Sequence, residues 1–81
     1  MSAMAAELSR EDVQTALAKV LLERVRQDNY PSTTQMDLLE EVIPPALVRD
    51  YVNVLLEKTL TSRFPSIPVL RRLQRVTSRL P

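Results

Sequence analysis

Cysteine, histidine and glycine are all missing from this sequence. Without cysteine the chain has no disulfide, no thiolate nucleophile and no zinc ribbon, and without histidine it lacks the commonest metal ligand and acid–base group. Without glycine it cannot form the glycine-rich loops that bind phosphates and dinucleotides. These absences exclude most enzyme classes, so we expect a protein that is not an enzyme and that holds no cofactor or metal ion.

Long hydrophobic runs are absent as well. The longest apolar stretch, Val42 to Val48, contains two prolines and is far too short to cross a bilayer. The first residues include neither the basic segment nor the apolar segment of a secretory signal. We therefore expect a cytoplasmic protein that makes no contact with a membrane.

The composition is that of one small globular domain. Of the 81 residues, 44% are apolar and 26% are charged, and the net charge is +1, values that argue against disorder and leave no room for a second core. We expect residues 1–8 to form a flexible N-terminal tail and residues 9–81 to form a single helical domain.

Four segments repeat their apolar residues with the period of a helix, and none alternates with the period of a strand. The expected helices run from Ser9 to about Asp28, from Ser32 to Ile43, from about Ala46 to Ser62 and from Ser66 to Leu80. Their expected core faces are, in order, Val13, Leu17, Val20 and Leu21; Met36, Leu39, Val42 and Ile43; Leu47, Tyr51, Val54 and Leu55; and Val69, Leu70, Leu73, Val76 and Leu80. The sequence thus predicts an all-α fold.

Serines mark where three of these helices begin. Ser9, Ser32 and Ser66 each precede a helix and are expected to accept a hydrogen bond from its first turn. Gln35 follows Ser32 at the spacing of a reciprocal capping box. Because the chain has no glycine, prolines are expected to end the helices instead.

The chain aligns with itself, without a gap, after a shift of 34 positions. Val20–Glu23 falls on Val54–Glu57, and Tyr30–Ser32 falls on Phe64–Ser66. Two unrelated amphipathic hairpins would share some of this pattern, since Leu, Val and Pro-Ser are common in helical proteins. An aromatic–Pro–Ser corner in register with both flanking helices favours an internal duplication.

The duplicated unit is a long helix, a corner and a short helix. It predicts a compact bundle of two tandem helix–corner–helix hairpins, residues 9–43 and 44–80. The aromatic residues of the two corners, Tyr30 and Phe64, are expected to fold back into the core, as in a hydrophobic staple displaced by one residue.

The two long helices each carry a second apolar face. Ala18, Leu22 and Val25 lie away from the expected core face of the first, and Val48, Val52 and Leu56 do so in the third. A surface helix normally has one apolar stripe, so we expect the surplus to bind a second copy, most simply in a dimer. The alternative is a closed bundle that keeps both faces inside. The candidate apolar partner-binding residues are Leu22, Val25, Val48, Val52 and Leu56.

Basic residues are concentrated in the C-terminal part of the chain. Residues 1–57 hold five basic and ten acidic side chains, whereas residues 58–81 hold six basic and no acidic ones. Arg71, Arg75 and Arg79 are spaced by four and share one helix face, beside Arg72.

Three interpretations of this arginine row compete. The row could be a solvated face of little energetic weight. It could dock on an acidic surface, either the helix with Asp37, Glu40 and Glu41 in another copy or a different protein. It could contact nucleic-acid phosphates, although the pI of about 8.2 is low for that role.

The sequence therefore predicts a small, non-catalytic protein–protein interaction module. It would be homodimeric and would bind a protein partner through its apolar helix face and its arginine row. The alternative is a small nucleic-acid-binding or transcription-regulatory protein that uses the helix with Arg71, Arg72, Arg75 and Arg79.

Overall fold

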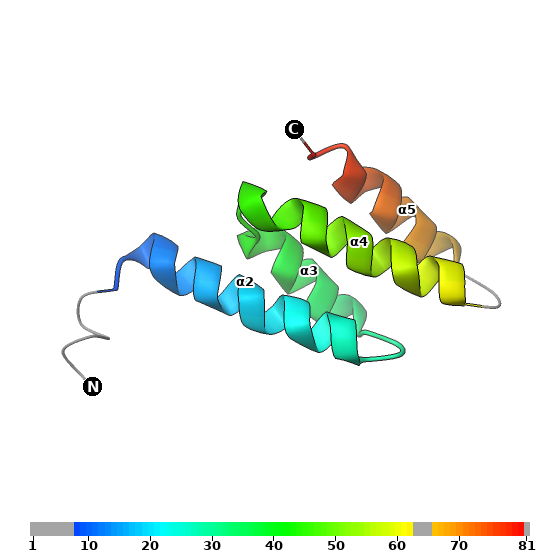
Figure 1. Cartoon of the computed structure of the whole chain (residues 1–81), viewed down its shortest axis with the longest axis horizontal. Coiled ribbons are helices and arrows are strands. Elements are labelled where there is room, and N and C mark those ends of the chain that lie inside the picture. The colour runs from blue at the N-terminus through cyan, green and yellow to red at the C-terminus, as the bar shows by residue number, and fades with distance from the viewer. Residues whose placement is uncertain (1–7, 63–65, 81) are drawn as a thin grey trace.

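The structure, a computed structural model, describes residues 8–62 and 66–80, and these residues form four helices and no strand. The helices are α2 (Arg10–Gln27), α3 (Thr33–Val42), α4 (Pro45–Thr61) and α5 (Ile67–Thr77), shown in Figure 1. The predicted all-α fold is confirmed. The predicted tail lies outside the described residues except for Leu8, and so does the corner residue Phe64.

The three serine caps predicted from the sequence are present. The hydroxyl of Ser32 accepts from the main-chain N–H of Gln35 at 3.0 Å, and that of Ser66 accepts from Val69 at 3.3 Å. A full capping box forms at Ser9, whose hydroxyl accepts from Asp12 N at 3.1 Å while the Asp12 carboxylate accepts from Ser9 N at 3.3 Å. The box predicted at Ser32 is only half formed, because the buried Gln35 side-chain oxygen has no hydrogen-bond partner among the described residues.

The C-terminus of α2 is closed by a side chain from another helix. Lys58 of α4 donates from Nζ to the main-chain carbonyls of Arg26 at 3.0 Å and Asp28 at 2.5 Å. Carbonyls in the last turn of a helix have no intrahelical donor, and a cation there is favoured by the helix dipole. In a chain without glycine, Lys58 thus satisfies carbonyls that a glycine C-cap commonly satisfies.

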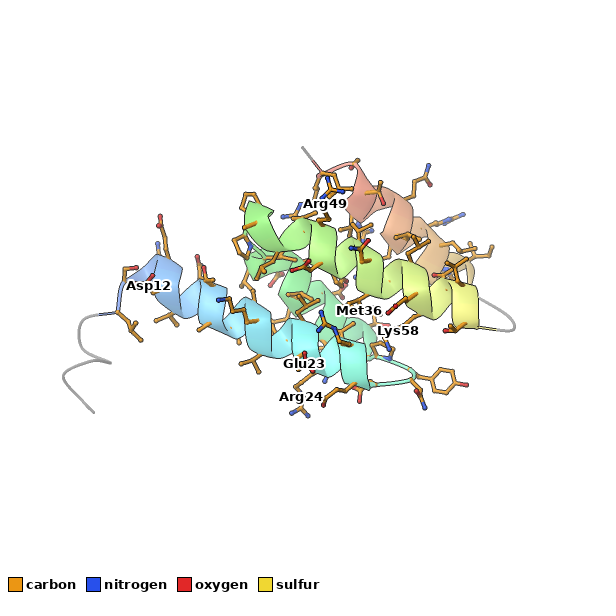
Figure 2. The ribbon with its side chains drawn as sticks, in the orientation of Figure 1. Asp12, Glu23, Arg24, Met36, Arg49 and Lys58 are labelled. Carbon is orange, nitrogen blue, oxygen red and sulfur yellow. The ribbon has the colours of Figure 1, made fainter. Side chains whose placement is uncertain are left out.

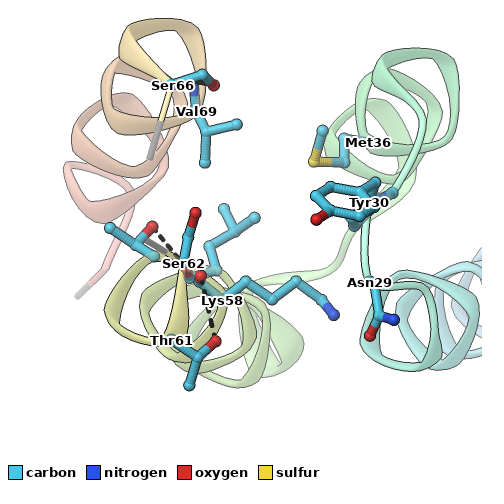
Figure 3. A pocket seen from close by; sticks show the side chains of 11 residues that line it. Asn29, Tyr30, Met36, Lys58, Thr61, Ser62, Ser66 and Val69 are labelled. Atoms are coloured by element: carbon cyan, nitrogen blue, oxygen red, sulfur yellow. Dashed lines mark hydrogen bonds between the residues drawn. The ribbon is translucent and has the colours of Figure 1, made fainter. Parts of the chain in front are cut away.

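The helices form two hairpins. Helix α2 packs on α3, α4 packs on α5, and the two long helices also touch. Viewed from one end, α2 and α4 lie on one side and α3 and α5 on the other (Figure 3). With eighteen residues against ten, α2 is longer than α3, and its first half projects beyond the other helices (Figure 1).

The core is one cluster of apolar side chains from all four helices. Its largest fully buried members are Tyr51, Leu39, Leu55, Val25, Val48 and Val76. The predicted core faces of α3 and α4 are therefore correct in their main residues. Helix α5 contributes mainly Val76, with Leu73 and Leu80 packed partly against the cluster.

The prediction for α2 chose the wrong face. Val13, Leu17 and Val20, expected in the core, are 52%, 39% and 58% exposed, whereas Leu22 and Val25 are buried. Both faces have the same helical spacing, so periodicity alone does not separate them. The ten-residue α3 covers only the second half of α2, and Leu22 and Val25 lie in that half.

The expected free apolar surface of α4 is also mostly internal. Val48 and Val52 are buried, because α4 lies between α2 and α5 and packs on both. Leu56 alone among the five apolar partner-binding candidates is exposed, at 42%. The expectation that Leu22, Val25, Val48 and Val52 form a free surface is thus wrong, and they are core residues of the single chain.

Tyr30 does not fold into the core either. Its side chain is 93% exposed, and the half-buried residue of this corner is Pro31. The residue directly before the Ser32 cap, which a hydrophobic staple requires, is Pro31. Tyr30 lies one position too early to fill that role.

Candidate functional site

The exposed apolar surface of the long helices is a stripe on α2. It consists of Val13, Leu17 and Val20, which we call the α2 stripe, and the spacing of four and three residues puts them on one helix face. Most of the stripe lies on the projecting half of the helix, where every side chain from Arg10 to Leu17 is exposed except the half-buried Thr15. Figure 2 shows Asp12 on this projecting part, while Met36 lies between the helices.

The arginine row meets an acidic surface, and that surface is α3 of the same chain. Arg72 of α5 places Nη1 2.5 Å from Glu40 Oε2 and 2.9 Å from Asp37 Oδ1. Arg75 places Nη2 3.1 Å from Glu40 Oε1. The phenol of Tyr51, on α4, donates to Glu40 Oε2 at 2.7 Å. We call Glu40, Tyr51, Arg72 and Arg75 the Glu40 cluster.

This cluster is largely withdrawn from water. The side chains of Glu40 and Arg72 are 12% and 10% exposed, and Tyr51 is fully buried. A buried charge is tolerated when it is paired and hydrogen-bonded, and here the carboxylate receives three donors. The cluster therefore joins α3, α4 and α5 inside one chain.

Ionisation of the cluster follows from these contacts. Burial alone would raise the pKa of Glu40, but hydrogen bonds from Arg72, Tyr51 and Arg75 outweigh it and hold that pKa below its ordinary value. Burial alone would lower the pKa of Arg72, but its hydrogen bonds to Glu40 and Asp37 hold it above. Burial, followed by the hydrogen bond to Glu40, raises the pKa of Tyr51 well above its ordinary value. Glu40 and Arg72 thus stay charged and Tyr51 stays protonated near neutral pH.

Arg79 also binds its own chain, because its Nη1 donates to the main-chain carbonyl of Glu40 at 3.0 Å. Of the predicted charged site residues, only Arg71 and Glu41 are exposed without a contact to the cluster or to Glu40 among the described residues. The row's helical spacing was read correctly from the sequence. What sequence reasoning missed is that Tyr51 joins the cluster and that the row turns inward.

A pocket of about 690 Å³ opens at the end of the bundle where both corners lie (Figure 3). Its apolar lining includes Met36, Leu55 and Val69, and Lys58, its one charged lining group, already caps α2. Two further lining residues, Ser62 and Ser66, flank residues 63–65, which lie outside the described residues. We assign the pocket no role.

No acidic side chains gather in a group of three or more that could hold a metal ion within residues 8–62 and 66–80. In the same part of the chain, no helix has the length and apolar character needed to cross a membrane. No protein family matches this chain, and comparisons with curated proteins and with solved structures find no significant match. The site is therefore argued from its own residues.

Proposed function

We propose that the protein is a small, non-catalytic protein–protein interaction module that works as a homodimer and docks through the α2 stripe. The observation that carries the proposal is the exposure of Val13, Leu17 and Val20 on a helix segment that projects beyond its neighbours. An apolar stripe on a surface helix is normally turned toward a core or a partner. Contiguous exposed apolar surface is typical of interaction sites.

The state of the arginine row favours this proposal over nucleic-acid binding. Phosphate contacts need arginine and lysine side chains that face solvent. Arg72 and Arg75 are bound to Glu40, and Arg79 is bound to its main-chain carbonyl. Binding a phosphate with these residues would cost the contacts that join α3 to α5.

The size of the stripe sets the expected strength of association. A pair of short helix faces buries less area than the roughly 1,600 Å² of a standard stable interface. We therefore expect a reversible dimer with a dissociation constant on the order of 10 μM, a value typical of small interfaces.

Sedimentation equilibrium over a range of protein concentrations tests the proposal. The wild-type chain should shift from 9.3 kDa to twice that mass as concentration rises, and Val20→Lys should abolish the shift. The matched control is Ile67→Lys on α5, since Ile67 is 59% exposed, as Val20 is at 58%, but lies outside the stripe. A wild-type chain that stays monomeric up to about 200 μM, well above the expected dissociation constant, contradicts the proposal.

A further inference from the structure

We infer that the two copies pair with their α2 helices antiparallel, joined by two ion pairs between Asp12 of each copy and Lys19 of the other. This inference rests on the proposed function, because it specifies how the α2 stripe meets its counterpart. Its occupant is a second copy of this chain. The charges around the stripe, and the part of α2 that projects, carry the argument.

Arginines close both ends of the stripe. Arg10 lies three residues before Val13 and Arg24 lies four after Val20, so both continue the same helix face, and both are exposed. In a parallel pair, residues of equal number meet near the axis, and each arginine would face its own copy. An antiparallel pair removes both repulsions, because it sets Arg10 beside the aliphatic residues near Val20 of the partner subunit.

One flank of the stripe is complementary to itself in reverse. Asp12 and Lys19 are seven residues apart, both exposed, and therefore lie on the same side of the stripe. In a two-fold antiparallel pair each flank meets the same flank of the other copy running backwards. With the two-fold axis level with the midpoint between Thr15 and Ala16, Asp12 lies opposite the partner's Lys19. The symmetry then forms the same ion pair twice.

The same midpoint fits the shape of the molecule. It overlaps residues 10–21 of the two α2 helices, which include the projecting half and the whole stripe. Helices α3, α4 and α5 pack against the later half of α2, so the two bundles lie at opposite ends of the pair. The antiparallel arrangement also opposes the two helix dipoles favourably.

Charge reversal with mixing tests the orientation. In Asp12→Lys homodimers, lysine faces lysine, and in Lys19→Asp homodimers, aspartate faces aspartate. We expect each variant to dimerise about tenfold more weakly than wild type, as two exposed ion pairs become repulsive. An equimolar mixture should form the heterodimer with roughly wild-type affinity, because both contacts become attractive again. The mixture holds the same chains, so a cap lost from Ser9 does not explain the recovery.

Two results would overturn the antiparallel pairing. One is that the single variants dimerise as wild type does, and the other is that the mixture is no stronger than its parents. If either occurs while Val20→Lys still abolishes dimers, the stripe is the interface but the orientation is wrong. If Val20→Lys has no effect, the proposed function itself fails.

Disulfide trapping gives a second readout that does not depend on charge. The chain has no cysteine, so a single introduced cysteine reports its own neighbour. A disulfide requires Cα atoms within about 7 Å. We expect Val13→Cys to link to Leu17→Cys in a mixture faster than it links to itself. Faster self-linkage of Val13→Cys would show a parallel pair and overturn the inference.

Discussion

Arg79 donates from Nη1 to the main-chain carbonyl of Glu40 at 3.0 Å, across the gap between α5 and α3. In an uninterrupted helix that carbonyl accepts from the N–H four residues later, but that residue is Pro44, which has no N–H. The proline that ends α3 therefore creates an unsatisfied acceptor, and the last arginine of the row satisfies it.

Arg79→Met should lower the free energy of unfolding by about 1 kcal/mol, the usual worth of one hydrogen bond to a charged donor at a partly exposed site. Urea denaturation measures this change. Arg71→Met is the control, because Arg71 is exposed on the same helix, and it should change stability by less than about 0.5 kcal/mol. Equal effects of the two substitutions would contradict the role given to Arg79.

Glu40→Ala should be among the most destabilising single substitutions in the chain. It leaves Arg72 buried and without its main partner, and removing one member of a buried ion pair costs about 3–5 kcal/mol. The remaining contact to Asp37 at 2.9 Å favours the lower end of that range. The neighbouring Glu41→Ala is the control, since Glu41 is exposed. A loss below about 1 kcal/mol at Glu40, the value of an exposed pair, would show that the cluster is not buried in solution.

Stability should fall in acid because of Glu40. Its pKa in the folded chain is held below the ordinary value of 4.5, so the unfolded chain takes up the proton first as the pH falls. The stabilisation is fully present above the unfolded pKa and is lost as the pH drops through the folded pKa. Urea denaturation between about pH 7 and pH 3 should show a smaller loss for Glu40→Gln than for wild type. Parallel losses in the two proteins would exclude Glu40 as the cause.

The two tyrosines should respond oppositely to the loss of a hydroxyl. Tyr51→Phe removes a donor to a buried carboxylate and should cost about 1–2 kcal/mol. Tyr30→Phe alters a side chain that is almost fully exposed and should change stability by less than about 0.5 kcal/mol. Thermal or urea unfolding of both variants checks this. A larger loss at Tyr30 than at Tyr51 would reverse the assignment of buried and exposed aromatic residues.

The helices could be predicted closely from local chemistry. Serine side chains cap Ser9, Ser32 and Ser66 through bonds that reach only three residues along the chain, so the sequence near each cap contains the whole signal. The core faces of α3 and α4 follow from their apolar spacing for the same reason. The internal duplication stays a prediction.

The choice of face on α2 could not be predicted, because it depends on the length and position of α3. Val13, Leu17 and Val20 have the same spacing as the buried face, and only the short reach of α3 leaves them exposed. The Glu40 cluster was missed for a related reason. Arg72 and Glu40 are thirty-two residues apart, and their opposite charges alone do not reveal whether they meet within one chain or between two.

Hydrogen exchange along α2 tests the central claim most directly. The amides of residues 11–17 lie on the projecting half of the helix, where few packed neighbours protect them from opening. If the α2 stripe binds a second copy, their exchange should slow as the protein concentration rises through the dissociation constant, while the amides of α4 change little. Exchange at residues 11–17 that stays fast and independent of concentration would contradict the account.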